Sequence, residues 1–230
     1  MQTQEPRPQW RSDSVGTLQD CPTGPAGEVW TLSAEPLAQH LRAGGAALFP
    51  TDTVPALAAL PAQASILWQL KRRPMDKPLI LMAADLEQLR QLLTITWRRS
   101  WLELAERSWP GAVTLVLPIE GQITQWLHPG GQSLGLRIPA CAAARDLLRR
   151  SGPLATTSVN RSGEPAAFDA LSAARAFPEL PLLGPIPWPV CLGQASRVLA
   201  WREAAGSDPE AWLELRPGPP ADAHAAPLQD

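Results

Sequence analysis

The sequence predicts a single α/β domain with a twisted mixed sheet and flanking helices. Its 230 residues, of which 45% are hydrophobic, suit one domain with a substantial core. Short apolar runs typical of buried strands alternate with segments whose apolar residues follow helical spacing. No internal repeat or long linker interrupts this alternation. The connections also favour a sheet that is not purely parallel.

The two ends of the chain differ in composition from the rest. Residues 1–27 mix Pro, Gln, Ser, Asp and Gly with almost no apolar periodicity, and residues 217–230 are rich in Pro and Ala. Such segments cannot bury enough apolar surface to offset the entropy of ordering. We therefore expect mobile tails around a folded domain over 28–216.

The first predicted elements are a helix and a strand. Ser33 can cap a helix over 34–42, which Gly44-Gly45 would end. The apolar run 46–49 then predicts a short strand, followed by a turn at 50–53. We treat the next residues, 55–58, as a continuation of that turn.

Helical spacing of apolar residues next predicts a helix over 62–72, which Pro74 prevents from continuing. The run 78–83 is typical of a buried strand. Asp85 is placed to cap a helix over 85–93.

An amphipathic stretch over about 97–107 predicts another helix, and Pro110-Gly111 separates it from a strand over 112–117. A further strand is expected over 133–138.

The last predicted elements begin with a helix over 139–150 and a strand over 154–158. A short helix follows over 171–177. The segments 197–201 and 211–215 predict closing strands.

Charge and cysteine content exclude several classes of protein. A net charge of −2 and a pI near 5.9 argue against a general nucleic-acid or membrane coat. The chain starts without an apolar signal core, and its best apolar run, 54–62, is too short to span a membrane. Three dispersed cysteines give neither a disulfide framework nor metal-ligand spacing. We expect a cytoplasmic protein with no metal bound directly by its side chains.

Both lysines of the chain, Lys71 and Lys77, fall within seven residues, whereas the other eighteen cations are arginines. Lys71 is expected in the last turn of a helix, with Arg73 and Lys77 in the loop beyond. A solvated basic helix end is one interpretation. The other is a site that requires compact point charges.

Polar residues that a core does not need stand in four segments: 50–53, 71–77, the strand around Arg137, and 156–160. Thr, Asp, Ser and Asn also form ordinary turns, which is the alternative for the first and last segments. Arg137 differs, because an arginine within an apolar strand must reach a carboxylate or a phosphate. It is a candidate anion clamp.

Five motifs occur in order: Phe49-Pro50-Thr51-Asp52-Thr53-Val54, Lys71-Arg72-Arg73-Pro74, Trp109-Pro110-Gly111-Ala112-Val113-Thr114, Gly135-Leu136-Arg137-Ile138-Pro139, and Ser158-Val159-Asn160-Arg161-Ser162-Gly163. A weaker sixth is Leu215-Arg216-Pro217-Gly218. Together they resemble the YrdC family of threonylcarbamoyl-AMP synthases. The resemblance implies a YrdC-like domain with a concave basic groove.

The resemblance also implies a reaction. L-Threonine, bicarbonate and ATP would condense to threonylcarbamoyl-AMP and pyrophosphate, for threonylcarbamoyl-adenosine modification of tRNA. Mg²⁺ would arrive with ATP. Other implied partners are RNA or tRNA and the downstream proteins that transfer the threonylcarbamoyl group.

Residue by residue, the resemblance assigns catalytic positions to Lys71, Arg73, Ser158 and Asn160. It assigns ATP contacts to Arg73, Lys77, Ser133, Ser158 and Arg216. It assigns L-threonine contacts to Thr53, Arg137, Thr156 and Ser196. No nucleophile or general base stands out, so catalysis would rest on positioning and electrostatics.

Some residues depart from the family pattern. Pro55-Ala56-Leu57-Ala58 replaces the usual Tyr-Gly-Leu-Gly, and Met82 stands where many members have histidine. These departures leave two alternatives open: a non-catalytic nucleotide- or RNA-binding paralogue, and a relative that uses another carbamoyl acceptor, as the similar domain of hydrogenase-maturation carbamoyltransferases does.

Overall fold

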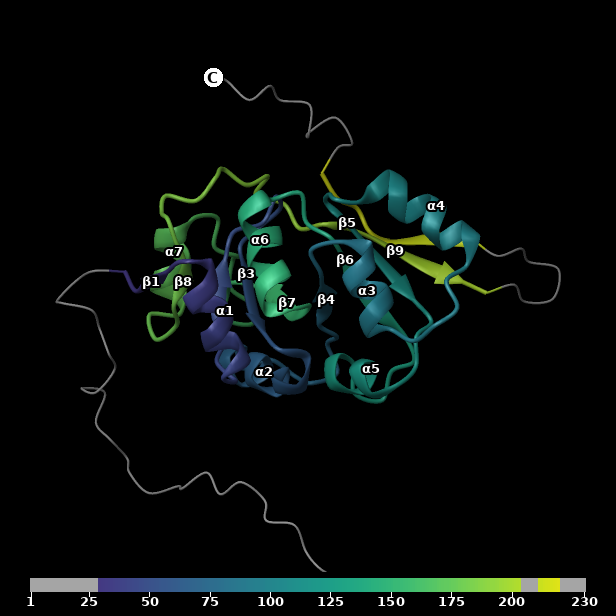
Figure 1. Ribbon diagram of the computed structural model, residues 1–230, viewed down its shortest axis with the longest axis horizontal. Coiled ribbons are helices and arrows are strands. Elements are labelled where there is room, and N and C mark those ends of the chain that lie inside the picture. Colours follow the sequence, from purple (N-terminus) through teal and green to yellow (C-terminus); the bar gives the residue numbers. More distant parts are fainter. Residues whose placement is uncertain (1–28, 204–210, 220–230) are drawn as a thin grey trace, which may run out of the picture.

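The computed structural model describes residues 29–203 and 211–219 (Figure 1). The predicted tail over 1–27 and most of the one over 217–230 lie outside these ranges. The described chain forms one ten-stranded mixed sheet in the order β1-β8-β2-β3-β7-β4-β6-β5-β9-β10. The strands are β1 (Thr31–Leu32), β2 (Ala47–Phe49), β3 (Ala56–Ala59), β4 (Ile80–Met82), β5 (Val113–Leu117), β6 (Leu134–Arg137), β7 (Leu154–Ser158), β8 (Leu182–Leu183), β9 (Arg197–Arg202) and β10 (Ala211–Arg216).

The helices are α1 (Ala34–Arg42), α2 (Ser65–Lys71), α3 (Leu86–Leu92), α4 (Arg99–Ser108), α5 (Gln122–Leu127), α6 (Ala142–Ser151) and α7 (Ala170–Ala176), with a 3₁₀ turn η1 (Pro61–Gln63) before α2. Asp85 caps α3 as predicted, because its Oδ1 accepts a hydrogen bond from the amide of Gln88 at 2.9 Å. Ser33 occupies the N-cap of α1, but its hydroxyl makes no capping bond. No helix within the described ranges is long and apolar enough to cross a membrane.

Alternate residues of the central strands enter two separate hydrophobic clusters. Leu57, Leu81 and Leu136 belong to the larger cluster, which also contains Leu67 of α2 and Trp101 of α4. On the other face, Phe49, Met82 and Leu154 pack with residues of α1 and α6, which lie against each other. Because strand side chains alternate between faces, β2, β3, β4 and β7 each contribute to both layers.

Most predicted elements are confirmed, but the treatment of residues 55–58 as a turn is wrong. Ala56–Ala59 form β3, buried on both faces and paired antiparallel with β2 and β7. Alanine has little intrinsic preference for strands, so only the flanking partners explain this one. The sequence also did not predict the short strands β1 and β8 or the six-residue helix α5.

The sheet register brings distant polar residues together at its centre. β7 lies between β3 and β4, and Ser158 pairs with Ala56 while Thr156 pairs with Ile80. β6 runs parallel to β4, with Arg137 opposite Met82. The predicted single mixed α/β domain is confirmed, whereas the concave basic groove stays a prediction.

Candidate functional site

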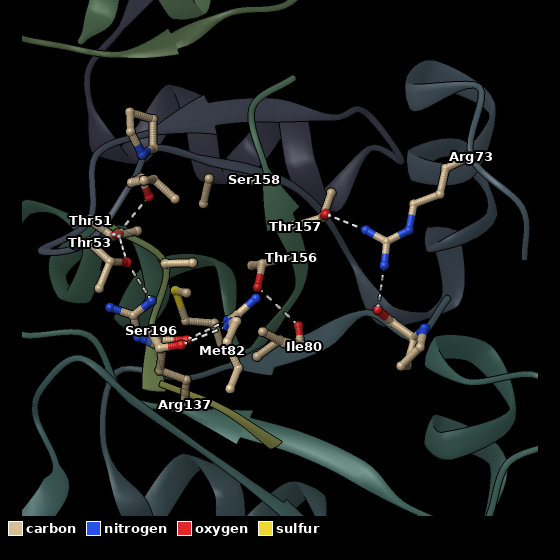
Figure 2. Close-up of a pocket in the computed structure, with 16 residues that line it drawn as sticks. Thr51, Thr53, Arg73, Ile80, Met82, Arg137, Thr156, Thr157, Ser158 and Ser196 are labelled. Atoms are coloured by element: carbon tan, nitrogen blue, oxygen red, sulfur yellow. Dashed lines mark hydrogen bonds between the residues drawn. The ribbon is translucent and has the colours of Figure 1, made fainter. Parts of the chain in front are cut away.

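A pocket of about 180 Å³ opens over the centre of the sheet (Figure 2). Its lining combines hydroxyls, three arginines and a few apolar side chains. The lining residues are Thr51, Thr53, Val54, Pro55, Ala56, Arg73, Pro78, Ile80, Met82, Arg137, Thr156, Thr157, Ser158, Ala195, Ser196 and Arg216. Seven of the eleven predicted site residues are therefore brought together: Thr53, Arg73, Arg137, Thr156, Ser158, Ser196 and Arg216.

One end of the pocket is built around Arg137, which is 4% exposed. Its Nη2 donates to Asp52 Oδ1 at 2.9 Å, its Nη1 to Thr53 Oγ1 at 2.7 Å, and its Nε to the Gly111 carbonyl at 3.2 Å. Burial lowers the pKa of Arg137, and the Asp52 carboxylate opposes that shift. The predicted requirement for a carboxylate partner is thus met within the chain itself.

The Thr51–Thr53 turn holds this end in place. Thr51 Oγ1 donates to the Val54 carbonyl at 2.7 Å and accepts from the Thr53 amide at 3.1 Å. Asp52 Oδ1 also accepts from the Ala140 amide at 3.1 Å, while Asp52 Oδ2 is buried without a hydrogen-bond partner. The turn therefore does more than reverse the chain: it fixes the orientation of Arg137. Sequence reasoning gave Asp52 no role, although its place between two pocket threonines was a usable signal.

Arg216 and Ser196 lie at the same end as Arg137. Arg216 donates from Nε to the Ser196 carbonyl at 3.0 Å and from Nη2 to Ser196 Oγ at 3.2 Å. Ser196 Oγ lies 2.8 Å from Thr114 Oγ1. The positive charge of Arg216 contributes to lowering the pKa of Arg137, so two guanidinium groups face one region of the pocket.

Arg73 lies on the opposite side of the pocket from Arg137 and Ser196 (Figure 2). Its Nη1 donates to Thr157 Oγ1 at 3.1 Å and its Nη2 to the Pro78 carbonyl at 3.3 Å. Its Nε is buried without a partner, and burial lowers the pKa of the guanidinium. Thr157, which sequence reasoning did not single out, thus positions a predicted site residue.

Lys71 is only 2% exposed and does not line the pocket. Its Nζ donates to the Ser158 carbonyl at 2.5 Å and to Asn160 Oδ1 at 2.7 Å. Ser158 Oγ donates to the same Asn160 oxygen at 2.7 Å. Burial, followed by the charge of Arg73, lowers the pKa of Lys71 to about 7. Lys71, Ser158 and Asn160 are therefore one connected group, of which only Ser158 lines the pocket.

Three further predicted positions stand apart from the pocket lining. Lys77 is exposed, and its carbonyl accepts a hydrogen bond from Trp68 Nε1 at 3.0 Å. Ser133 precedes β6, and its carbonyl contacts His128 Nδ1 at 3.0 Å. Asn160 fixes the loop after β7 by donating from Nδ2 to the Glu164 carbonyl at 2.7 Å. None of these three side chains lines the pocket.

The donor set does not fit a metal held by the protein. The pocket lining contains no carboxylate, and the parts of the chain that the structure describes hold no group of three or more His, Cys, Asp or Glu residues that could bind a metal ion. Mg²⁺ prefers oxygen ligands that include carboxylates. Guanidinium and hydroxyl donors instead suit carboxylates and phosphates.

Comparison with known proteins identifies relatives of this chain. The Sua5/YciO/YrdC family model, described as "Telomere recombination", matches residues 39–183. A threonylcarbamoyl-AMP synthase of Stutzerimonas stutzeri is 34% identical over 146 residues, which are 62% of this chain and 78% of that protein. One from Nitrosococcus oceani is 38% identical, over 61% of this chain and 77% of that protein.

Solved structures agree with the fold. Sua5 of P. abyssi complexed with L-threonine is 29% identical, with a TM-score of 0.71 over 80% of this chain and 54% of that chain. This chain therefore spans little more than half of the Sua5 protein. E. coli YciO, at 18% identity and a TM-score of 0.67, shares the fold. The family model and these relatives together show that the chain belongs to the Sua5/YciO/YrdC family.

Proposed function

We propose that this protein is an L-threonylcarbamoyladenylate synthase, a nucleotidyltransferase that forms threonylcarbamoyl-AMP and pyrophosphate from L-threonine, bicarbonate and ATP. The observation that carries the proposal is the pocket with arginines at both ends and no lining carboxylate. Two anionic reactants must be held together there. The P. abyssi relative complexed with L-threonine supports an amino-acid substrate.

The Arg137 end suits the threonine carboxylate. Arginine has five N–H donors, and Arg137 uses three on Asp52, Thr53 and Gly111. One N–H on each terminal nitrogen remains, which matches the two oxygens of a carboxylate. Thr156 and Ser196 line the same pocket, and their hydroxyls are candidates for the polar groups of threonine.

The Arg73 end suits the nucleotide. We assign five residues to ATP: Arg73, Lys77, Ser133, Ser158 and Arg216. Arg216 would lie between ATP and L-threonine, because it contacts Ser196. Lys77 and Ser133 do not line the pocket. They can contact ATP only if the nucleotide extends beyond the pocket.

The reaction proceeds in two steps. The threonine amine attacks bicarbonate, water leaves, and a carbamate forms. A carbamate oxygen then attacks the α-phosphorus of ATP, the bond to the bridging oxygen breaks, and its electron pair leaves with pyrophosphate. Arg73 and Arg216 stabilise the added negative charge in the transition state. Lys71 and Asn160 contribute by fixing Ser158.

Magnesium belongs to the substrate in this proposal, because the residues that the structure describes offer no carboxylate set for it. It would enter with the phosphates of ATP. The product would pass to tRNA through downstream proteins that transfer the threonylcarbamoyl group.

The test is mass spectrometry of the products formed from ATP, bicarbonate, magnesium and a mixture of amino acids. We expect threonylcarbamoyl-AMP and pyrophosphate, both dependent on threonine and on bicarbonate. Formation of a carbamoyl-adenylate of another amino acid would show that this amino acid, and not threonine, is the substrate. ATP binding without any adenylate, beside an active control enzyme, would instead support the non-catalytic paralogue.

A further inference from the structure

A second cavity, of about 190 Å³, shares no lining residue with the candidate functional site. It lies where the start of α3, the end of α4 and the first turns of α6 meet; the three helices are labelled in Figure 1. Its lining residues are Ala84, Asp85, Leu86, Ala105, Glu106, Trp109, Pro110, Ile138 and Arg145. The proposed reaction does not use this cavity, although three of its lining residues, Trp109, Pro110 and Ile138, belong to the sequence motifs.

Arg145 is the unusual member of this lining. Its Nε is buried without a hydrogen-bond partner, and no ion pair joins Arg145 to another residue of the described chain. Arg145 as a whole is only half-buried, but a buried N–H donor such as its Nε is costly to leave without an acceptor and normally has a partner. A carboxylate in the cavity would supply one.

The remaining lining restricts what that carboxylate can belong to. Trp109, Ile138 and Leu86 give an apolar wall suited to an aliphatic or aromatic body. Glu106 is exposed at the rim and makes no hydrogen bond or ion pair within the described chain. A simple anion would lie close to the carboxylates of Glu106 and Asp85, which would repel it. A simple amine would leave Arg145 Nε without a hydrogen-bond acceptor.

We propose that this cavity binds a small zwitterion with an apolar body, of the α-amino acid class, with its carboxylate on Arg145 and its ammonium group on Glu106. The apolar side chain packs against Trp109, Leu86 and Ile138. This site is separate from the proposed threonine site and does not depend on the proposed reaction.

The two sites are nevertheless neighbours. Pro110 of the cavity wall precedes Gly111, whose carbonyl accepts from Arg137 Nε and whose amide donates to the Ile138 carbonyl at 2.9 Å. An amino acid could thus reach Arg137 instead of Arg145, so the experiment must separate the two.

The experiment is calorimetric titration of the full chain with L-leucine and L-phenylalanine. We expect saturable binding of at least one. 4-Methylpentanoate and 3-methylbutylamine, which lack the amino group and the carboxylate of leucine respectively, should bind at least about tenfold more weakly. No saturable binding of either amino acid up to about 10 mM, or equal binding of the two analogues, overturns the proposal.

Variants locate the site. Arg145→Met should weaken binding at least about tenfold, whereas Arg149→Met, an exposed position on the same helix, should not. Full retention of binding in Arg145→Met, with competition by L-threonine, would place the ligand in the first pocket and overturn the proposal. Should Arg145→Met fail to fold, Glu106→Gln at the exposed rim decides: weakened binding supports the site, and unchanged binding contradicts it.

Discussion

The two lysines of this chain illustrate how different two residues of one motif can be. Both lie within residues 71–77, yet Lys71 is buried against Ser158 and Asn160 while Lys77 is exposed. A motif read from sequence gives residue types and spacing but not which side chains turn inward. That direction depends on Ser158 at the end of β7, 87 residues further along the chain.

A pH titration tests the environment of Lys71. Its pKa is lowered to about 7 in the folded protein, from an ordinary value of 10.5. Between these values the unfolded chain binds a proton there that the folded chain does not. The free energy of unfolding should therefore rise with pH over this window, and less so in Lys71→Met.

The measurement is urea unfolding at several pH values above 7, with Lys77→Met as the matched control that keeps the wild-type slope. In protein labelled with ¹³C-lysine, only two side chains contribute signals. A Lys71 signal that does not titrate near pH 7 would contradict the prediction.

A substitution of Arg73 tests its proposed contact with the nucleotide. Arg73→Met should lower kcat/KM for adenylate formation by about 10²–10³, on the order of losing one preorganised charge contact. Arg72→Met, an exposed neighbour that does not line the pocket, should change it little. Equal rates for both variants would remove Arg73 from the proposed nucleotide contacts.

The buried pair of Arg137 and Asp52 affects stability as well as binding. Arg137→Met leaves a carboxylate that is 9% exposed without its cation. Such a change typically costs about 3–5 kcal/mol of unfolding free energy. Arg137→Met combined with Asp52→Asn should cost less than the sum of the single changes, measured by urea unfolding. Strict additivity would show that the two side chains are not coupled.

At the scale of elements, α2 ends in a way that presents the nucleotide side of the pocket. Arg72 adopts the left-handed conformation with φ 51°, and the Arg73 amide donates to the Trp68 carbonyl at 3.0 Å. This conformation is usually left to glycine at helix ends. It reverses the chain direction at the end of α2, so that the next residue, Arg73, lines the pocket.

Relieving this strain should stabilise the protein. Arg72→Gly removes the clash of the side chain with its own backbone and should raise the free energy of unfolding by about 0.5–1 kcal/mol. Arg72→Ala keeps a Cβ and should not raise the free energy of unfolding. Thermal unfolding of the two variants is the measurement. An increase in stability of Arg72→Ala equal to that of Arg72→Gly would be evidence against backbone strain at Arg72.

Elements with strong local signals were predictable, and those defined by their neighbours were not. The helix over 34–42 was predicted at its observed bounds because its apolar spacing and the following glycines agree. β3 is a strand because β2 and β7 flank it, and nothing in Pro55-Ala56-Leu57-Ala58-Ala59 indicates this locally. In the same way, the Asp52 contact of Arg137 depends on pairing across 85 residues.

At the scale of the whole molecule, the described ranges define a compact unit that should suffice for the fold. A chain of residues 29–219 should keep an unfolding free energy within about 0.5 kcal/mol of the full chain, as expected when the removed segments lack apolar periodicity. A chain that ends at Leu215 should lose adenylate formation because Arg216 is missing. A large loss of stability in the 29–219 chain would show that the ends contribute to the fold.

The order of residues along the chain also matters during synthesis. The pocket draws on Thr51 near one end of the domain and Arg216 near the other. A ribosome must therefore translate past Arg216 before the site exists, and β9 and β10 must emerge and add to the sheet. A nascent chain that stops short of Arg216 holds no complete binding site, so substrates can stabilise this fold only after Arg216 has been translated.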